Sequence, residues 1–265
     1  MAPPSKQPEP ESDSLWTLLQ NNYLFRDLDE KTLSNYLPAD SLKVEKLYSN
    51  RLIYTAYRPG TSLDALYLLI QGGPVIVRST PLDRIIAISY PGGCFGMRSL
   101  PLSYGLVYNA FPSQVEAYKN TDVLQIPLEI IHKIYENHLE FQDRYNALLE
   151  LRQKFEYHLL NCSTYPPQAV AALLRALVYQ ERGLGNQPNS NGIYSFDLPV
   201  DVIARACQLN HRTVEQVLKG MQKVGLLKAS KSSEVPGDLV QVIDAEGLKE
   251  VYGATRDKVS WWPLR

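Results

Sequence analysis

The segment from Leu198 to Leu227, LPVDVIARACQLNHRTVEQVLKGMQKVGLL, constrains the fold of this chain more than any other stretch. Its apolar residues recur at the spacing that places side chains on one face of a helix, and Gln208-Leu209-Asn210 interrupts that pattern. Asn210 is a favourable N-cap, because its side-chain oxygen can accept a hydrogen bond from an unpaired amide of the next turn. The segment therefore predicts two short helices joined by a tight turn, the second at about 211–223.

Long polar side chains gather at the start of the second predicted helix. A recognition helix enters the major groove of DNA by this end, where some side chains reach base edges and others hold phosphates. The residues expected to contact DNA are Asn210, His211, Arg212, Thr213, Gln216 and Lys219, together with Lys228 and Lys231 in a following hairpin.

The local charge around these helices also suits a polyanion. Formal net charge is only -1 for the whole chain, so a nucleic-acid surface must come from local clustering. Between positions 200 and 233 the only anions are Asp201 and Glu215. The cations of the same stretch are Arg205, Arg212, Lys219, Lys223, Lys228 and Lys231. An ordinary two-helix segment with a solvated basic face is the alternative interpretation.

The same residues resemble the winged helix-turn-helix of the cyclic-AMP receptor protein/FNR (CRP/FNR) family of bacterial transcription regulators. The matching positions are Ile203-Ala204, Asn210, His211-Arg212-Thr213-Val214 and Gly225-Leu226-Leu227. The resemblance implies that His211, Arg212 and Gln216 read bases. Two of these three differ from the best-known member, so the resemblance implies no particular operator sequence.

From about residue 42 to 126 the chain consists of short runs rich in Val, Ile, Leu and Tyr, separated by Gly, Pro and Asn. Such runs predict an antiparallel sandwich or barrel. Arg58-Pro59-Gly60-Thr61 and the stretch from Leu66 to Gly72 resemble the cyclic-nucleotide-binding β-roll. The expected fold is α+β: an N-terminal antiparallel β-roll, a long dimerisation helix and a C-terminal winged helix-turn-helix.

The segment that would hold a nucleotide departs from the family pattern. Alignment places Met97 where the family has a Glu that contacts the ribose, and Phe111 where it has an Arg that neutralises the cyclic phosphate. Binding of cyclic AMP in the usual mode is therefore not expected. The candidate pocket residues are Gly96, Met97, Arg98, Tyr104, Tyr108 and Phe111. Three interpretations are open. These residues fill the pocket, or they bind another effector with Arg98 as the anion contact, or the domain receives its signal from a protein partner.

Residues 139–160 predict a long helix with one apolar stripe. A second copy of the chain could cover that stripe in a parallel pair, which resembles the dimerisation helix of the family. The predicted dimer contacts are Leu139, Tyr145, Leu148, Arg152, Phe155 and Leu159. Packing of the stripe within the monomer is the alternative.

The predicted organisation has five parts. Residues 1–14 are polar and predict a disordered tail. The β-roll with its leading helices follows at 15–126, the dimerisation helix region at 127–165 and the winged helix-turn-helix at 166–252. The tail, 253–265, carries Trp261 and Trp262, a pair that we expect to dock on its own protein or on a partner.

Other classes of protein find little support in the sequence. The four histidines and three cysteines lack metal-ligand spacing, and no nucleophile elbow, P-loop or dinucleotide fingerprint occurs, so no enzyme, metal or cofactor is expected. An apolar run long enough for a bilayer is also missing, which favours a cytoplasmic protein without membrane contact.

The sequence thus predicts a homodimeric regulator that binds a near-palindromic site on double-stranded DNA. RNA polymerase or another regulatory protein is a further candidate partner. In the competing hypothesis the chain is chiefly an interaction module, in which the altered β-roll and the C-terminal tail recruit a partner that controls DNA binding.

Overall fold

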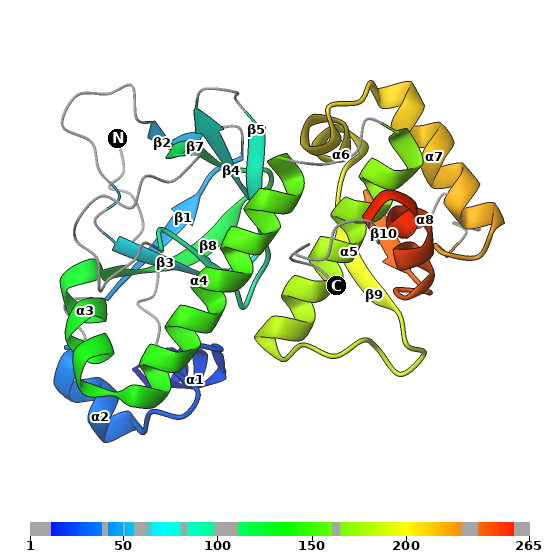
Figure 1. The fold of residues 1–265 in the computed structure, drawn as a ribbon. Helices are drawn as coiled ribbons and strands as arrows, with labels where there is room; N and C mark the ends of the chain where they lie inside the picture. Colours follow the sequence, from blue (N-terminus) through cyan, green and yellow to red (C-terminus); the bar gives the residue numbers. More distant parts are fainter. Residues whose placement is uncertain are drawn as a thin grey trace, which may run out of the picture.

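The computed structural model of the chain describes residues 12–38, 42–49, 51–55, 63, 65–80, 84–97, 111–160, 165–228 and 238–256. An N-terminal β-roll with flanking helices is followed by the long helix α4 and then by a mainly helical C-terminal part (Figure 1). Arg58 to Thr61, Arg98, Tyr104, Tyr108, Lys231, Trp261 and Trp262 lie outside the described residues, so the predictions on them stay predictions.

The β-roll consists of two antiparallel sheets. The first has the strand order β1-β8-β3-β6 and the second β2-β7-β4-β5. The strands are β1 (Lys43–Leu47), β2 (Leu52–Thr55), β3 (Ala65–Gln71), β4 (Val75–Thr80), β5 (Arg84–Ser89), β6 (Cys94–Phe95), β7 (Phe111–Ala117) and β8 (Thr121–Pro127). All but β6 overlap the apolar runs of this stretch, and β7 begins at Phe111, which the sequence assigned to the candidate ligand segment. The two residues of β6 are too few to show an alternating pattern.

Apolar side chains from both sheets fill the interior of the roll. Leu69 and Val123 of the first sheet share one buried cluster with Val77 and Val115 of the second. Phe95 belongs to this cluster, and Tyr67 packs against it by stacking in parallel on Phe95, with ring centroids 4.5 Å apart. Alternation along each strand thus sends one set of side chains inward and the other set outward.

Three helices cover the outer face of the first sheet. They are α1 (Ser12–Asn21), α2 (Glu30–Tyr36) and α3 (Leu128–Asn137). Asp29 caps α2 by accepting a hydrogen bond from the amide of Thr32. The helix α1 begins at Ser12, so the last three residues of the predicted disordered tail are helical.

The apolar stripe of the long helix α4 (Leu139–Leu160) is buried within a single chain. Tyr145, Leu148, Phe155 and Leu159 are between 0% and 6% exposed, against the β-roll and α5 (Pro166–Leu184). The prediction that these four residues contact a second copy is therefore wrong, because they have no surface left to offer. Leu139 is exposed and Arg152 half-buried.

The C-terminal part is built on α5, whose side chains from Ala169 to Val178 are buried. It continues with β9 (Tyr194–Asp197), α6 (Val200–Cys207), α7 (His211–Lys223), β10 (Leu239–Val242) and α8 (Gly247–Arg256). Its core is continuous with Ile76, Ile85 and Ile88 on the outer face of the second sheet. Since α8 runs to Arg256, the first four residues of the predicted C-terminal tail are helical. None of the helices among the described residues is long and apolar enough for a membrane span.

Candidate nucleic-acid interface

The helices α6 and α7 and the turn between them form the predicted two-helix unit. Gln208 ends α6 in a left-handed conformation, with φ 54° and ψ 42°. A residue with a Cβ adopts this conformation at a cost of roughly 1 kcal/mol, and it reverses the chain within a single turn. Asn210 then caps α7 as predicted, since its side-chain oxygen accepts a hydrogen bond from the Thr213 amide at 2.8 Å. The start of α7 is thereby fixed at His211.

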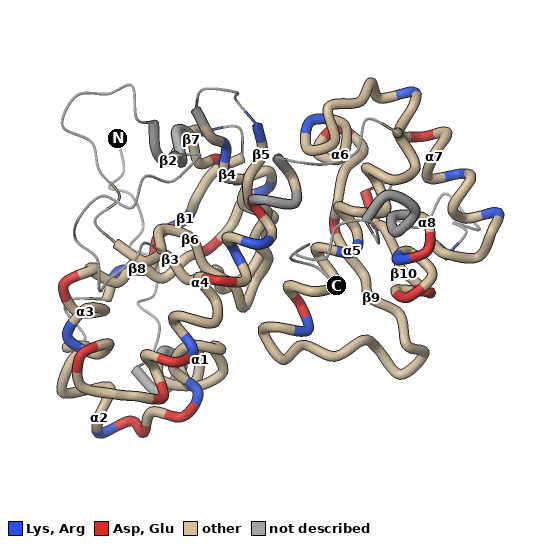
Figure 2. The backbone as a smooth tube through the Cα atoms, viewed as in Figure 1, with Lys and Arg blue, Asp and Glu red and all other residues tan. Residues whose placement is uncertain are grey.

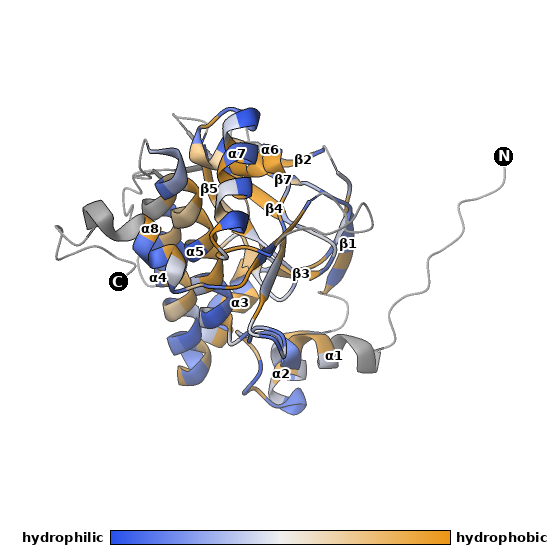
Figure 3. Cartoon of the chain, turned by 90° about the vertical axis from the view of Figure 1, so that its right-hand side faces the viewer, coloured by the Kyte–Doolittle hydropathy of each residue, from blue (hydrophilic) through white to orange (hydrophobic). Residues whose placement is uncertain are grey.

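One face of α7 packs inward and the other is open. Val214 and Met221 are buried in the C-terminal core, which fixes the rotation of the helix about its axis. The predicted contact residues His211, Arg212, Gln216 and Lys219 are exposed, and Thr213 is half-buried. The structure thus brings all five onto the outer side of one helix. In Figure 3, where α7 faces the viewer, much of the helix is hydrophilic.

The open face of α7 lies on the side of the molecule away from the β-roll (Figure 1). Figure 2 shows basic positions along α7 on this outer side. Neither sheet of the roll covers the helix, so a large ligand can approach it. The arrangement satisfies the geometric condition for a recognition helix, which must project from the protein surface to enter a groove.

The base of a wing lies next to the two helices. Strand β10 pairs with β9 in antiparallel register, with Leu239 opposite Asp197 and Val242 opposite Tyr194. On its other side Val242 forms a bridge with Leu227. Lys228 follows this bridge, and its side chain is exposed. Residues 229–237, which include Lys231 and the predicted wing turn, lie outside the described residues.

Two charged residues have roles that the sequence did not reveal. Arg205, counted among the cations around the helices, faces the β-roll and pairs with Glu116 at 2.5 Å. Glu215 lies on the exposed face of α7, where its carboxylate is 3.6 Å from the Nδ1 atom of His211. The i, i+4 spacing of His211 and Glu215 was the available signal for this contact. A carboxylate on this face can accept a hydrogen bond from a cytosine amino group.

The candidate ligand segment is only partly described. Gly96 has φ +88°, and a Cβ at this position would lie 2.4 Å from the Ala65 carbonyl oxygen, so a larger residue would not fit. Met97 is half-buried and packs against the cluster beneath the N-terminal helices. Phe111 is the first residue of β7, opposite Thr80. Whether these residues line a binding site stays a prediction.

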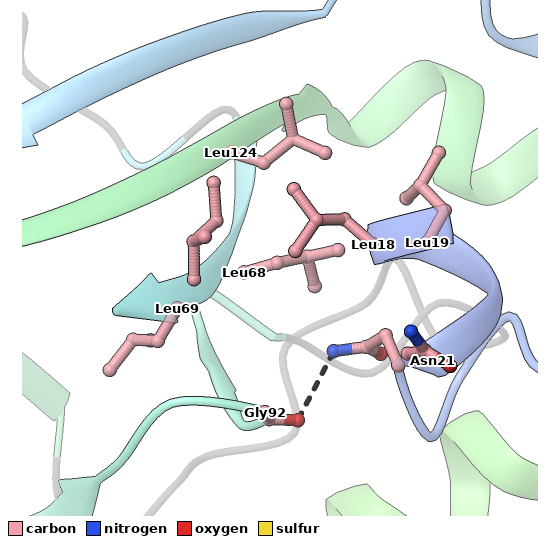
Figure 4. A pocket seen from close by; sticks show the side chains of 9 residues that line it. Leu18, Leu19, Asn21, Leu68, Leu69, Gly92 and Leu124 are labelled. Atoms are coloured by element: carbon pink, nitrogen blue, oxygen red, sulfur yellow. Dashed lines mark hydrogen bonds between the residues drawn. The ribbon is translucent and has the colours of Figure 1, made fainter. Parts of the chain in front are cut away.

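A different cavity lies between α1 and the first sheet (Figure 4). It has a volume of about 200 Å³ and is lined mainly by leucines, among them Leu18, Leu68 and Leu124. At its edge the Asn22 side chain donates a hydrogen bond to the Gly92 carbonyl oxygen at 3.1 Å and accepts one from the Leu24 amide at 3.0 Å. Gly96 and Met97, the predicted ligand residues whose surroundings the structure describes, do not line this cavity.

The described residues contain no group of three or more His, Cys, Asp or Glu side chains that could hold a metal ion. The thiol of Cys94 is buried, which raises its pKa to about 11. A thiol with such a pKa stays protonated at neutral pH and is a poor nucleophile and metal ligand.

Comparisons with solved structures show which fold this is. One match is FixK2 from Bradyrhizobium japonicum, at 15% identity and a TM-score of 0.57 over 79% of this chain and 96% of that one. Another is a mutant of CooA from Carboxydothermus hydrogenoformans, at 17% identity and a TM-score of 0.59 over 87% and 95%. A putative transcriptional regulator of the crp/fnr family from Eubacterium rectale matches at 18% identity over 87% and 98%. The TM-score of that match is 0.49.

These likenesses confirm the fold class predicted from the sequence, an α+β chain with an N-terminal β-roll and a C-terminal helix-turn-helix. The predicted resemblance to CRP/FNR regulators is thus confirmed at the level of the fold. No protein-family model matches the chain. Nor does any curated protein match it.

Proposed function

We propose that this chain is a sequence-specific DNA-binding transcription regulator that acts as a homodimer. The observation that carries this proposal is the exposed outer face of α7. Asn210 caps the start of this helix, and its buried inner face fixes its orientation. No part of the described chain covers the outer face. Its outer face presents Arg212, Gln216 and Lys219, which are side chains that read bases or hold phosphates. Lys228 at the base of the wing adds a second contact to the DNA backbone.

Arg212 and Lys219 have different parts in the proposed interface. Arg212 is in the first turn of α7, the end that enters the groove, and its guanidinium can form two hydrogen bonds with a guanine edge. Lys219 is two turns further along, where the groove wall and its phosphates are nearer. We therefore assign base reading to Arg212 and phosphate binding to Lys219.

The test begins with selection of a binding site from a pool of randomised duplexes, followed by fluorescence anisotropy at several salt concentrations. Arg212→Ala is expected to cost roughly 1–3 kcal/mol and to relax the preference at one base position. Lys219→Ala is expected to weaken binding to all sequences and to lower the salt slope by about one. The control is Lys133→Ala, which removes an exposed lysine of α3. Binding without salt dependence or sequence preference would contradict the proposal.

The two-fold contact of the proposed homodimer must lie outside the buried stripe of α4. Between residues 140 and 150, the exposed side chains of α4 include Asp143, Asn146 and Glu150. These polar residues do not form an apolar seam. Two copies of α7 would read half-sites about one helical turn of DNA apart. Light scattering of the protein with the selected duplex measures the stoichiometry, and one chain per duplex would exclude the dimer.

For the β-roll we propose either a ligand-free scaffold or a sensor for a molecule other than cyclic AMP. Two observations support this proposal: the apolar filling of the roll, and Met97 in place of the family's Glu. Mass spectrometry of the protein, purified under native conditions and then denatured, distinguishes the scaffold from the sensor. A stoichiometric small molecule would establish the sensor, and an empty protein that binds DNA tightly would establish the scaffold.

A further inference from the structure

The C-terminal part is attached to the β-roll by a group of polar contacts, which we call the junction. These contacts lie between α6, β9 and the turn of the helix-turn-helix on one side and, on the other, strands β5 and β7 and the turn that follows β7. The junction residues of the roll are Arg84, Glu116 and Lys119, and those of the C-terminal part are Asp197, Arg205 and Gln208.

Lys119 joins the roll to both strands at the base of the wing. Its ammonium nitrogen is 2.7 Å from each carboxylate oxygen of Asp197 and 3.6 Å from Asp238. The hydrogen bond to Asp197 raises the pKa of Lys119, so the ammonium stays charged at neutral pH. Asp197 is the last residue of β9 and Asp238 immediately precedes β10. One charge of the roll therefore holds the strand that leads into α6 together with the strand that returns from the wing.

Two further contacts attach the helix-turn-helix itself. Arg205 of α6 pairs with Glu116 of β7 at 2.5 Å. Arg84, the first residue of β5, donates a hydrogen bond from Nη2 to the side-chain oxygen of Gln208 at 2.5 Å. Because Gln208 is the left-handed residue between α6 and α7, this bond acts on the turn that sets the direction of α7.

The junction and the open face of α7 are on different sides of the helix-turn-helix. The cations of the junction are turned toward carboxylates and an amide of the same chain, and the side chains of Lys119 and Arg205 are only 41% and 34% exposed. The contact residues of α7 stay exposed while the junction is closed. The junction therefore does not cover the candidate DNA surface, and its cations are not free to bind phosphates.

We propose that Arg84, Lys119 and Arg205 are positioning residues for DNA binding: they fix the orientation of α7 relative to the β-roll without contacting DNA. The inference rests on the proposed function. A helix held in one orientation loses less freedom on binding, so a closed junction favours affinity. In a dimer, the same contacts would set the separation of the two recognition helices.

The test compares the unaltered chain with the double variant Lys119→Met and Arg205→Met on the selected duplex. We expect the affinity to fall roughly tenfold, the size expected from the loss of two partly exposed ion pairs. The salt slope should stay unchanged, because the number of phosphates that the protein contacts is the same. Lys219→Met is the contrast, since loss of a phosphate contact lowers the slope by about one. Lys133→Met is the matched control for loss of a lysine elsewhere.

Three further measurements test the role of the charge, the folding of the variants and the junction in the absence of DNA. Lys119→Arg keeps the charge and should retain most of the affinity, whereas Lys119→Met should not. Circular dichroism of each variant shows whether it is folded. Hydrogen exchange without DNA should be faster at the amides of α6 and β9 in the double variant, because the polar contacts that hold these elements against the roll are lost while the apolar core between the two parts remains.

An unchanged or higher affinity of the folded double variant would overturn the proposal. A salt slope lowered as in Lys219→Met would also overturn it, because the junction cations would then be phosphate contacts. If the unaltered chain binds no duplex at all, the proposed function fails. Unchanged exchange at the amides of α6 and β9 in the double variant then refutes the junction as well, and faster exchange shows that it holds these elements in place.

Discussion

The burial of α4 within one chain predicts the effect of replacing Phe155 by alanine. The Phe155 side chain is 2% exposed and lies in the cluster that joins α4 to α5 and to the outer face of β4 and β5. Truncation of a buried phenylalanine removes its transfer free energy and leaves a cavity, together costing roughly 3–5 kcal/mol. Since every contact lies in the same chain, Phe155→Ala should lower the free energy of unfolding by this amount at any protein concentration.

The assay is urea unfolding, followed by circular dichroism, at two protein concentrations about a hundredfold apart. If the stripe were a dimer interface, mass action alone would change the apparent stability of the unaltered chain by about 2.7 kcal/mol over this range. The loss caused by Phe155→Ala would then shrink on dilution. Leu139→Ala is the matched control, because Leu139 is on the same helix but 66% exposed, and we expect a change within about 0.5 kcal/mol. A loss for Phe155→Ala below roughly 1 kcal/mol, or one that disappears on dilution, would refute the reasoning.

Two further predictions concern single polar side chains. Asn210→Ala removes the cap that binds the Thr213 amide, so thermal unfolding should show a loss of about 1 kcal/mol and anisotropy a weaker affinity for DNA. Asn210→Asp should retain both properties, and equal behaviour of the two variants would argue against the cap. Burial raises the pKa of Glu156 from 4.5 to about 7, so its contribution to stability is complete below pH 4.5 and is lost as the pH rises through about 7. In urea unfolding Glu156→Gln should therefore remove part of the decline in stability across this window, and an unaltered decline would exclude Glu156 as its source.

Local signals in the sequence were sufficient for the helix-turn-helix and for most strands. Asn210 is a strong N-cap followed by a periodic apolar pattern, and both the cap and the start of α7 are where the sequence placed them. The strands of the roll were found because alternating apolar runs are separated by turn residues. In such segments the local preference and the packed fold agree.

The stripe of α4 shows what the pattern of apolar residues cannot predict. Periodicity revealed that Tyr145, Phe155 and Leu159 share one side of a helix, and that side is buried as an apolar stripe must be. Periodicity carries no information about what covers a stripe. Two expectations were open, a second copy and the same chain. The helices that cover the first sheet bury Tyr145, and α5 buries Phe155 and Leu159, so only the packed fold decides between the two.

A count of charges along the sequence does not show which cations are already paired within the fold. Arg205 is eleven positions or fewer from most predicted contacts, so the sequence counts it with the cations available to DNA. Its partner Glu116 is 89 residues away, and no local pattern links the two. Once this pair forms, the exposed cations on and next to α7 among the described residues are Arg212, Lys219, Lys223 and Lys228, opposed by Glu215. The β-roll therefore alters the charge that the helix-turn-helix can present to a polyanion, through the same contacts that hold it in place.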